Sequence, residues 1–520
     1  MPVEPPALLE GWPPSGDPTP PPQAARESPP ATPARPRFKP IDRNQPFFRA
    51  VDVQALLEED HPARAIWAFV EKLDLSRFAE KVRAVEGAAG RSAYDPRLMV
   101  SLWIYAYSQG VGSGRELSRL CGFHPAYQWL TGAQSISDRS LNGFRVAHQP
   151  ALEELFIKVV GVLSAEGLVK LERVMQDGTK IGACAASDSF RRKQKIEQHL
   201  EEARAHLCAV TQGSEEELSL KRIKAQERAA QERVERLEAA LEEFGGLDRE
   251  GKSDQDKRVS TSDPQARVMK QPNGGFAPSY NAQVTTDAAS TAVLSAQLTQ
   301  AGHDCDQLLP ALGRLEETFQ QKPNQMVADG GYVTRSNVVH AAAAQVQLIG
   351  PVTAPAAKAQ QCYERLGITA DFHAERFQYN HREDCFSCPG GRQLHCEGRT
   401  QTEFAVIFKY RAESQECAVC PLKSQCCPHN QKSGRSVQRT QPHPEIVEFQ
   451  RRMATPEAQQ IYRQRSQVAE TPHLWWKAKF RLRQFHVRGL VKAGTELLWV
   501  ALTYNIALLL RARRSRWACV

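Results

Sequence analysis

Two short apolar segments that each end in an Asp-Gly pair constrain the fold of this chain more than any other feature. Residues 326–328 form the apolar run of a buried strand, and Asp329 with two glycines follows. Residues 171–176 have a similar pattern and are followed by Asp177 and a glycine. Because ligands of open α/β sheets collect at the carboxyl ends of strands, the pattern predicts two carboxylates that share a cation. Each pair taken alone also fits a plain turn, in which Asp and Gly are favoured for local reasons.

The segments around these two acids predict a mixed α/β fold. Strand patterns recur at 280–286 and 291–297, and the short turn between them is typical of a hairpin. We expect an amphipathic helix over 306–320, a second helix over 336–344 and an apolar strand over 346–352. This order predicts a sheet with both antiparallel and parallel pairs, flanked by helices.

The first 150 residues contain two segments of different character. Residues 1–40 are rich in Pro and poor in large apolar residues, so we expect a disordered tail. From 47 to 150 the apolar spacing is helical, and Pro96 opens one expected helix as an N1 proline. Four arginines of this helical domain fit either a DNA phosphate backbone, in a helix-turn-helix-like arrangement, or a solvated helical face. They are Arg115, Arg119, Arg139 and Arg145.

A charged segment separates the first strand region, 170–188, from the rest of the sheet domain, 260–352. Residues 189–250 are rich in Glu, Lys, Arg and Gln, with apolar residues at helical spacing and a break at 211–214. We therefore expect a helical hairpin inserted into the sheet domain. At 520 residues the chain exceeds the usual size of one core, which fits an architecture with several such units.

The net charge and the apolar segments indicate which partners and which cellular location to expect. The net charge of +8 weakly favours a polyanion. No secretion signal is apparent, so we expect a cytoplasmic protein without a membrane partner. The longest apolar run, 497–510, contains polar residues and is too short for a bilayer of about 30 Å. It predicts a buried helix.

Seven of the thirteen cysteines lie between 385 and 427, within a segment (353–455) that we expect to be a second insertion. Two Cys-x-x-Cys pairs are typical of a zinc site, because each pair forms a tight turn and four thiolates complete a tetrahedral shell. The expected ligands are Cys385, Cys388, Cys417 and Cys420, and Cys396 or Cys426 is an alternative for one of them. Reduced cysteines without metal are an equal alternative, and an iron–sulfur cluster is a more remote one.

A third acid that could complete a metal site lies in the C-terminal segment 456–512. Glu470 and Lys477 are seven residues apart, so a regular helix places both on one face. Pro472 removes a backbone donor, and we therefore expect the helix to begin near Thr471 with Glu470 at its edge. An amphipathic surface helix without any function explains the same charges.

Taken together, these residues resemble bacterial insertion-sequence transposases with an RNase H-like catalytic domain and an Asp-Asp-Glu triad, in the branch with a Tyr-Arg-Glu-Lys signature. The resemblance extends from about residue 47 to 511 and includes Ser262-Asp-Pro-Gln-Ala-Arg267, the strand at 280–283 and Arg488-Gly489. The residues that match the triad and signature are Asp177, Asp329, Glu470, Tyr462, Arg465 and Lys477. One departure is that four residues separate Arg465 from Glu470, where the best-known members have three.

The resemblance implies DNA cleavage and strand transfer. Phosphoryl transfer of this kind uses two divalent cations about 3.5–4 Å apart, and an oxygen-rich site suits Mg²⁺ or Mn²⁺. We expect Asp177 to bridge the two ions, with Asp329 and Glu470 each holding one. Metal-bound water would cut the element end, and the freed 3′-hydroxyl would then attack target DNA.

The resemblance also implies partners. One partner is double-stranded DNA, both as the terminal inverted repeats of the element and as the target. Another is a second copy of the chain, in a synaptic homodimer. The resemblance implies a location at the bacterial nucleoid. Trp475 or Trp476 would stack on an unpaired base or lie in the core. Backbone phosphates are expected to contact Tyr462, Arg465, Lys477, Arg488, the basic run 477–492 and the basic tail 513–520.

Three other functions fit the same sequence. One is a non-mobile DNA-binding protein derived from a transposase, and another is a nuclease that only hydrolyses DNA. The third is a zinc-dependent regulator in which the acids are turn residues. Loss of cleavage with retained DNA binding in an Asp329→Asn variant would argue against the third.

Overall fold

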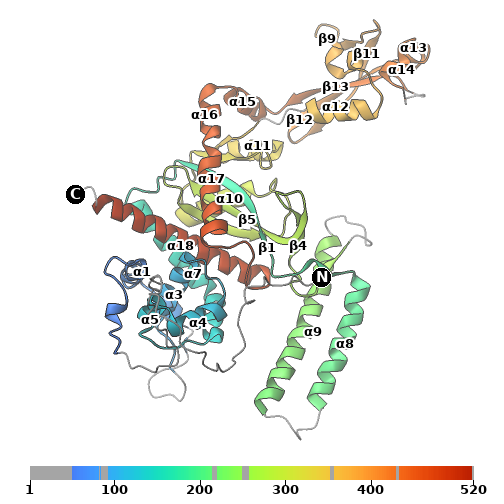
Figure 1. Ribbon diagram of the computed structural model, residues 1–520. Helices are drawn as coiled ribbons and strands as arrows, with labels where there is room; N and C mark the ends of the chain where they lie inside the picture. Colours follow the sequence, from blue (N-terminus) through green and yellow to red (C-terminus); the bar gives the residue numbers. More distant parts are fainter. Residues whose placement is uncertain are drawn as a thin grey trace, which may run out of the picture. The chain divides into compact units, whose positions relative to one another are not determined.

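The computed structural model describes residues 50–80, 82, 92–212, 220–248, 257–351, 356–428 and 433–517. The chain divides into two units, residues 1–51 and 52–520, and the elements described below belong to the second. The tail expected over residues 1–40 lies outside the described residues. Figure 1 shows the elements with their labels.

The first part of the second unit is helical. Its elements are η1 (Gln54–Leu56), α1 (Pro62–Val70), α2 (Ser76–Ala79), α3 (Pro96–Ser108), α4 (Gly114–Phe123), α5 (Pro125–Thr131), α6 (Asp138–Ala147) and α7 (Gln149–Ala165). Helix α3 begins at Pro96 as the sequence predicts, and the Asp95 carboxylate accepts a hydrogen bond from the Arg97 N–H at 2.7 Å. Residues 99–107 are all buried, so α3 is enclosed on every side and forms the centre of this helical region.

The sheet is mixed, as the sequence predicts. Its strands are β1 (Arg173–Gly182), β4 (Arg267–Lys270), β5 (Phe276–Asp287), β6 (Val293–Thr299), β7 (Gln325–Ala328) and β8 (Gln347–Ile349). The order is β4-β5-β1-β7-β8, and β6 pairs with β5 as well. Strand β5 runs antiparallel to β1, β4 and β6, whereas β1, β7 and β8 are parallel. The expected helices over 306–320 and 336–344 are confirmed as α10 (Leu308–Phe319) and α11 (Arg335–Ala343).

The long apolar helix α18 (Leu490–Trp517) packs on β6, α3 and α7. It is long and apolar enough to span a membrane, but most of its apolar window is buried inside the protein. Asn505 is a buried polar residue of this helix, and its side-chain amide makes hydrogen bonds to β6. It accepts from the Val293 N–H at 2.9 Å and donates to the Val293 carbonyl at 2.7 Å. The buried helix expected over 497–510 is thus confirmed.

The charged segment forms two long helices, α8 (Lys193–Gln212) and α9 (Leu220–Asp248), which pack against each other. A short two-stranded sheet, β2 (Phe190–Arg191) with β3 (Val259–Ser260), lies at the base of the pair. The helices share a separate apolar core, as their spacing predicts. This core contains Ile196, Leu200, Ala203, Val234, Leu237, Ala240, Phe244, Leu247 and Val259.

The cysteine-rich segment has a five-stranded antiparallel sheet of its own. The strands are β9 (Gln378–Asn380), β10 (Cys385–Ser387), β11 (Gln393–Thr402), β12 (Ala405–Ala412) and β13 (Ser436–Pro442). The helical elements with it are α12 (Ala356–Arg365), η3 (Ala370–Phe372), η4 (Ala374–Arg376), α13 (Ser414–Ala418) and α14 (Lys423–Cys426). Two helices, α15 (Pro444–Met453) and α16 (Pro456–Arg463), then lead to α17 (Arg465–Leu474).

Candidate active site

Asp177 and Asp329 lie side by side on neighbouring parallel strands. Gln176 of β1 is opposite Ala328 of β7, and the two aspartates follow this pair. Asp329 comes just after the end of β7, whereas Asp177 lies within β1, which continues to Gly182 against β5 instead of turning at Gly178 as the sequence predicts. The Gly178 N–H donates to Asp177 Oδ1 at 2.9 Å, and the Gly331 N–H donates to Asp329 Oδ1 at 2.8 Å. A Cβ at Gly331 would lie 3.0 Å from that same Asp329 oxygen, so the turn requires a residue without a side chain.

The electrostatics of Asp177 are those of a crowded acidic site. The pKa of the Asp177 carboxyl is raised to about 6, mainly by burial and to a smaller extent by the charges of Asp329 and Asp304. The charge of Arg465 and the Gly178 N–H act in the opposite direction. Arg465 Nη1 lies 3.4 Å from Asp177 Oδ2. Further positive charge would therefore favour the ionised form of Asp177.

Asp304 is an acidic residue that the sequence interpretation missed. Asn281 Nδ2 and Gln283 Nε2 each donate to Asp304 Oδ1 at 2.7 Å, and Lys180 Nζ lies 3.9 Å away. A Cβ on Gly178 would lie 2.6 Å from the same oxygen, which places Asp304 directly beside β1, at the residue that follows Asp177. Asp304 lies in a loop five residues after the end of β6 and is not followed by glycine, so the pattern of an apolar run ending in Asp-Gly did not mark it.

The loop that carries Asp304 brings three further potential ligands together. His303, Cys305 and Asp306 offer ligand atoms within 4.8 Å of one another. His303 and Asp306 are exposed, and Cys305 is half-buried. Since such groups are common at protein surfaces without a metal, we assign them no function.

Helix α17 packs on β1 and β5, but it begins earlier than the sequence predicts (Figure 1). It starts at Arg465 rather than near Thr471, contains Pro472, and continues into a π-helical turn, η5 (Trp475–Lys479). Pro472 is buried against the core. Tertiary packing therefore holds a helix that the local proline pattern disfavours.

Helix α17 and η5 direct three side chains at Asp177 and its neighbour Thr179. Besides Arg465, His473 Nδ1 lies 3.8 Å from Asp177 Oδ2, and Lys477 Nζ donates to Thr179 Oγ1. Glu470 precedes His473 by one turn, so the two lie on the same side of the helix. The Glu470 side chain is exposed to solvent and makes no hydrogen bond or ion pair with any residue that the structure describes.

His473 is a second residue that the sequence interpretation missed. Burial lowers its pKa to about 3, with smaller effects from the charges of Lys477 and Arg465, so the imidazole is neutral at physiological pH. Its Nε2 has no hydrogen-bond partner within the described residues. A lone histidine just before Trp475 and Trp476 gave no sequence signal for this position.

The two tryptophans after His473 differ in environment. Trp476 is fully buried, as expected for at least one of them. Trp475 is half-buried against Tyr504, with the Lys479 ammonium 4.2 Å and the Arg511 guanidinium 5.1 Å from its ring centroid.

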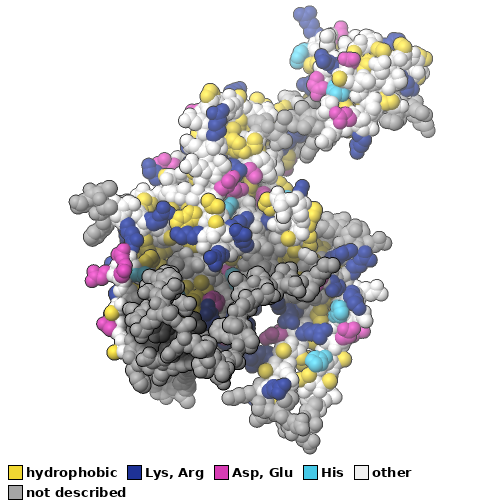
Figure 2. Space-filling view, in the orientation of Figure 1, with side chains coloured by type: hydrophobic (Ala, Val, Ile, Leu, Met, Phe, Trp, Pro, Cys, Tyr) yellow, Lys and Arg dark blue, Asp and Glu magenta, His cyan; other side chains and the backbone are white. Residues whose placement is uncertain are grey.

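The expected phosphate contacts also differ from one another. Tyr462 packs partly buried against the main core, whereas Arg465 is engaged with Asp177. Lys477 is half-buried and Arg488 is exposed. Figure 2 shows Lys and Arg side chains on the face that carries α17.

The three shorter stretches that carry the resemblance meet at Asp263. Its Oδ1 accepts from the Tyr280 hydroxyl at 2.8 Å and from the Gly489 N–H at 3.0 Å. Gln265 Oε1 accepts from the Leu490 N–H at 2.8 Å. Gly489 has φ +86°, a conformation that favours glycine. Residues 262–267, 280–283 and 488–489 thus form one structural junction at the start of α18.

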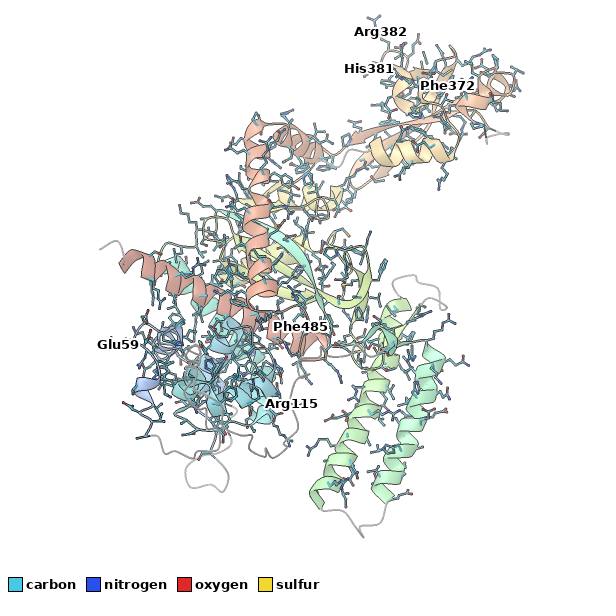
Figure 3. The ribbon with its side chains drawn as sticks, viewed as in Figure 1. Glu59, Arg115, Phe372, His381, Arg382 and Phe485 are labelled. Carbon is cyan, nitrogen blue, oxygen red and sulfur yellow. The ribbon has the colours of Figure 1, made fainter. Side chains whose placement is uncertain are left out.

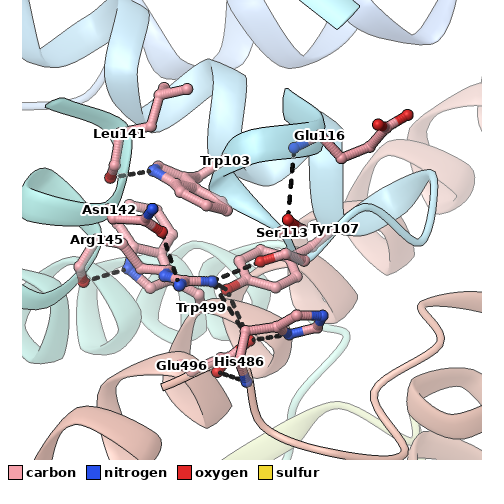
Figure 4. A network of polar contacts seen from close by, with 11 residues as sticks. Trp103, Tyr107, Ser113, Glu116, Leu141, Asn142, Arg145, His486, Glu496 and Trp499 are labelled. Carbon is pink, nitrogen blue, oxygen red and sulfur yellow. Dashed lines mark hydrogen bonds and ion pairs between the residues drawn. The ribbon is translucent and has the colours of Figure 1, made fainter. Parts of the chain in front are cut away.

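Arg145, one of the four arginines considered for DNA contact, is buried instead (Figure 4). Its Nη1 donates to the Gly112 carbonyl at 2.6 Å and lies 3.5 Å from Glu496 Oε1 of α18. Its Nη2 donates to Asn142 Oδ1 at 2.9 Å. A guanidinium that is 2% exposed cannot reach DNA, so the phosphate-contact interpretation is wrong for Arg145.

The other three arginines lie at the surface. Arg119 forms an ion pair with Glu116 at 2.6 Å and stacks on Phe123. Arg115 and Arg139 are exposed, and Figure 3 labels Arg115 at the rim of the helical region.

The cysteines expected to bind zinc are not all in one place. Cys388, Cys417 and Cys420 line one cavity together with Cys426 and Cys427. Cys385 is not part of its lining, and its Sγ lies 3.8 Å from Glu383 Oε2. Consecutive strand residues point to opposite faces, which the Cys-x-x-Cys spacing alone does not show. The expected set of four therefore does not share one cavity, because Cys385 lies outside it.

Comparison with known families adds independent evidence. Residues 387–510 match a family model described as a transposase DDE domain, and residues 51–146 match one described as a transposase domain (DUF772). These matches support an insertion-sequence transposase. No curated protein and no solved structure matches the chain. Transposase DDE domains cleave nucleic acid and normally use divalent metals, and this match includes α17 with Glu470.

Proposed function

We propose that this transposase cleaves the ends of an insertion sequence and joins them to target DNA, with Asp177, Asp329 and Glu470 as its catalytic acids. The observation that carries this proposal is the register of the parallel strands β1 and β7, in which the pair Gln176–Ala328 is followed by Asp177 within β1 and by Asp329 just after β7. Helix α17, which carries Glu470, packs on β1. In the proposed site, three remote segments of the chain would supply acids to one region of the sheet.

The order of the strands supports an RNase H-like catalytic domain. Strands β6, β5, β1, β7 and β8 are neighbours in that sequence, with β5 antiparallel to β1 and with β7 and β8 parallel to it. Tyr462, Arg465, Glu470 and Lys477 would form the Tyr-Arg-Glu-Lys signature. Helices α8 and α9 and the cysteine-rich sheet would be insertions in this domain.

The residues present fit divalent cations. Asp177 has its pKa raised by burial and by two neighbouring aspartates, and a carboxylate of this kind ionises readily only beside positive charge. Asp177, Asp329 and Glu470 would hold Mg²⁺ or Mn²⁺, and ions bound there would activate the attacking oxygen and stabilise the leaving one.

The other side chains around Asp177 would bind the DNA backbone. Arg465 and Lys477 lie beside the acids and would neutralise phosphate oxygens near the scissile bond. Neutral His473 adds no charge of its own, and it limits access of water to Asp177 because it is buried against it. Exposed Arg488 would add a phosphate contact at the edge of the site.

The experiment is a cleavage and joining assay. Purified protein is incubated with Mg²⁺, an end-labelled duplex that carries the DNA flanking the coding sequence, and a supercoiled target plasmid. We expect cut and joined products from the wild type, and neither product from Asp177→Asn, Asp329→Asn or Glu470→Gln, all with retained DNA binding. Glu457→Gln, an exposed acid in the first turn of α16, is the matched control and should keep full activity.

Two outcomes would count against the proposal. Cut products without joined products would indicate a nuclease that only hydrolyses DNA. Full activity in Asp329→Asn would show that the acids are turn residues and would favour a regulatory protein.

A further inference from the structure

The cysteine-rich segment has a small core of its own. The buried residues of this core are Ile368, Phe372, Phe377, Phe386, Leu394, Tyr410, Ala412, Cys426, Cys427 and Val437. Phe372 is labelled within this segment in Figure 3. Sheets with so few buried apolar residues commonly need a disulfide or a metal to be stable, and every cysteine described in this segment is a free thiol.

Five of these thiols line one cavity. Cys388 follows β10, Cys417 lies in α13, Cys420 lies between α13 and α14, and Cys426 ends α14 with Cys427 after it. Cys388 thus belongs to the turn after β10, and the other four belong to the segment with α13 and α14. Two separate parts of the cysteine-rich segment therefore contribute cysteines to one cavity.

Two of the turns have the backbone geometry that suits thiolate ligands. The Arg392 N–H donates to Cys388 Sγ at 3.3 Å, and the Arg435 N–H donates to Cys417 Sγ at 3.4 Å. Hydrogen bonds of this kind orient the sulfur atoms, as outer contacts do around metal ligands. Gly391, with φ +80°, closes the turn that begins at Cys388, and its N–H donates to the Cys388 carbonyl at 2.8 Å.

The cavity is closely packed. Leu422 and Arg435 line it together with the cysteines. A Cβ at Gly390 would lie 3.3 Å from Leu422 and 3.7 Å from Cys388 Sγ, so the turn packs closely against the opposite side of the cavity.

We propose that Cys388, Cys417, Cys420 and Cys426 bind one structural Zn²⁺ and that Cys385 does not. Zinc is the metal that four thiolates in a closed structural site bind most readily. Cys426 completes the set because it ends α14, the short helix after Cys420, and lines the same cavity as Cys388. Cys385 lies outside the cavity, and Cys396 is exposed on β11.

The test measures metal in the full-length protein by inductively coupled plasma mass spectrometry. We expect one zinc per chain in the wild type, and the same in Cys385→Ser and Cys396→Ser. Loss of most of the zinc is expected in Cys388→Ser and Cys426→Ser. Cys396→Ser is the matched control, since it removes a thiol of the same segment outside the cavity.

A second measurement uses the wild type alone, in case a variant fails to fold. Co²⁺ replaces the zinc, and the intensity of the thiolate-to-cobalt charge-transfer band reports the number of sulfur ligands, which we expect to be four. The proposal is overturned by protein without zinc, by iron with acid-labile sulfide, by a cobalt spectrum of fewer thiolates, or by loss of zinc in Cys385→Ser.

Discussion

Removing the Glu496 carboxylate should destabilise the junction between the helical region and α18. Glu496 is fully buried, and it accepts hydrogen bonds from the His486 backbone N–H at 2.8 Å and the Tyr107 hydroxyl at 3.4 Å. It is also the only acid paired with Arg145 among the described residues, at 3.5 Å. Glu496→Ala therefore leaves a buried guanidinium without a counter-charge and a backbone N–H without an acceptor.

The size of the effect follows from these contacts. Breaking one partner of a buried ion pair costs about 3–5 kcal/mol. Arg145 keeps two neutral acceptors, the Gly112 carbonyl and Asn142 Oδ1, so we expect the lower end, about 3 kcal/mol. With a urea dependence of about 3 kcal/mol per molar, the unfolding midpoint should fall by about 1 M.

The assay is urea unfolding followed by tryptophan fluorescence. Two indoles report on this network directly, because Trp499 Nε1 donates to the Arg145 carbonyl at 3.0 Å and the Arg145 guanidinium lies 4.7 Å from the Trp103 ring centroid. The double variant Arg145→Met with Glu496→Met should recover most of the lost stability, since apolar residues of similar size replace buried pairs at little cost.

Arg139→Ala serves as the exposed control and should change the free energy of unfolding by no more than about 0.5 kcal/mol. The reasoning is refuted if Glu496→Ala unfolds at the wild-type midpoint, or if the double variant is no more stable than the single one.

Three further predictions concern metal, DNA and zinc. Because the pKa of Asp177 is raised to about 6, protons compete with the metal below that pH. The affinity for Mn²⁺, measured by calorimetry, should therefore fall as the pH decreases from 7 to 5. An affinity that does not change with pH would exclude Asp177 as a ligand. Arg115→Ala and Arg139→Ala should each weaken DNA binding equally for all sequences, and each should reduce the slope of log binding constant against log salt concentration by about one. An unchanged slope in both variants would show that the DNA binds elsewhere. Chelation of zinc should speed trypsin cleavage within residues 356–442 while the rest of the protein remains resistant, and equal cleavage with and without chelator would contradict a structural metal there.

The strands could be predicted from the sequence because their signals are local. Apolar runs that end in Asp-Gly mark the positions of β1 and β7, and the hairpin pattern marks β5 and β6. The predicted end of β1 is wrong, because β1 continues through Asp177 and Gly178 to Gly182 in its pairing with β5. In parallel strands the residues after the last pair are neighbours, so the side-by-side position of Asp177 and Asp329 follows from the same signals.

The parts that could not be predicted depend on tertiary contacts. Asp304 comes from a loop, and only its hydrogen bonds with Asn281 and Gln283 hold it near Asp177. The buried position of Arg145 depends on Glu496, which is 351 residues away in the sequence. The early start of α17 requires packing of Pro472 against the core, which a proline pattern alone argues against.

A crystal structure of the protein with Mn²⁺ and a DNA end, with anomalous scattering from the metal, tests the central proposal most directly. We expect anomalous peaks at about 2.1 Å from carboxylate oxygens of Asp177, Asp329 and Glu470, with Asp177 shared between two ions. Metal bound only by other acids, with the Glu470 carboxylate directed into solvent, would contradict it.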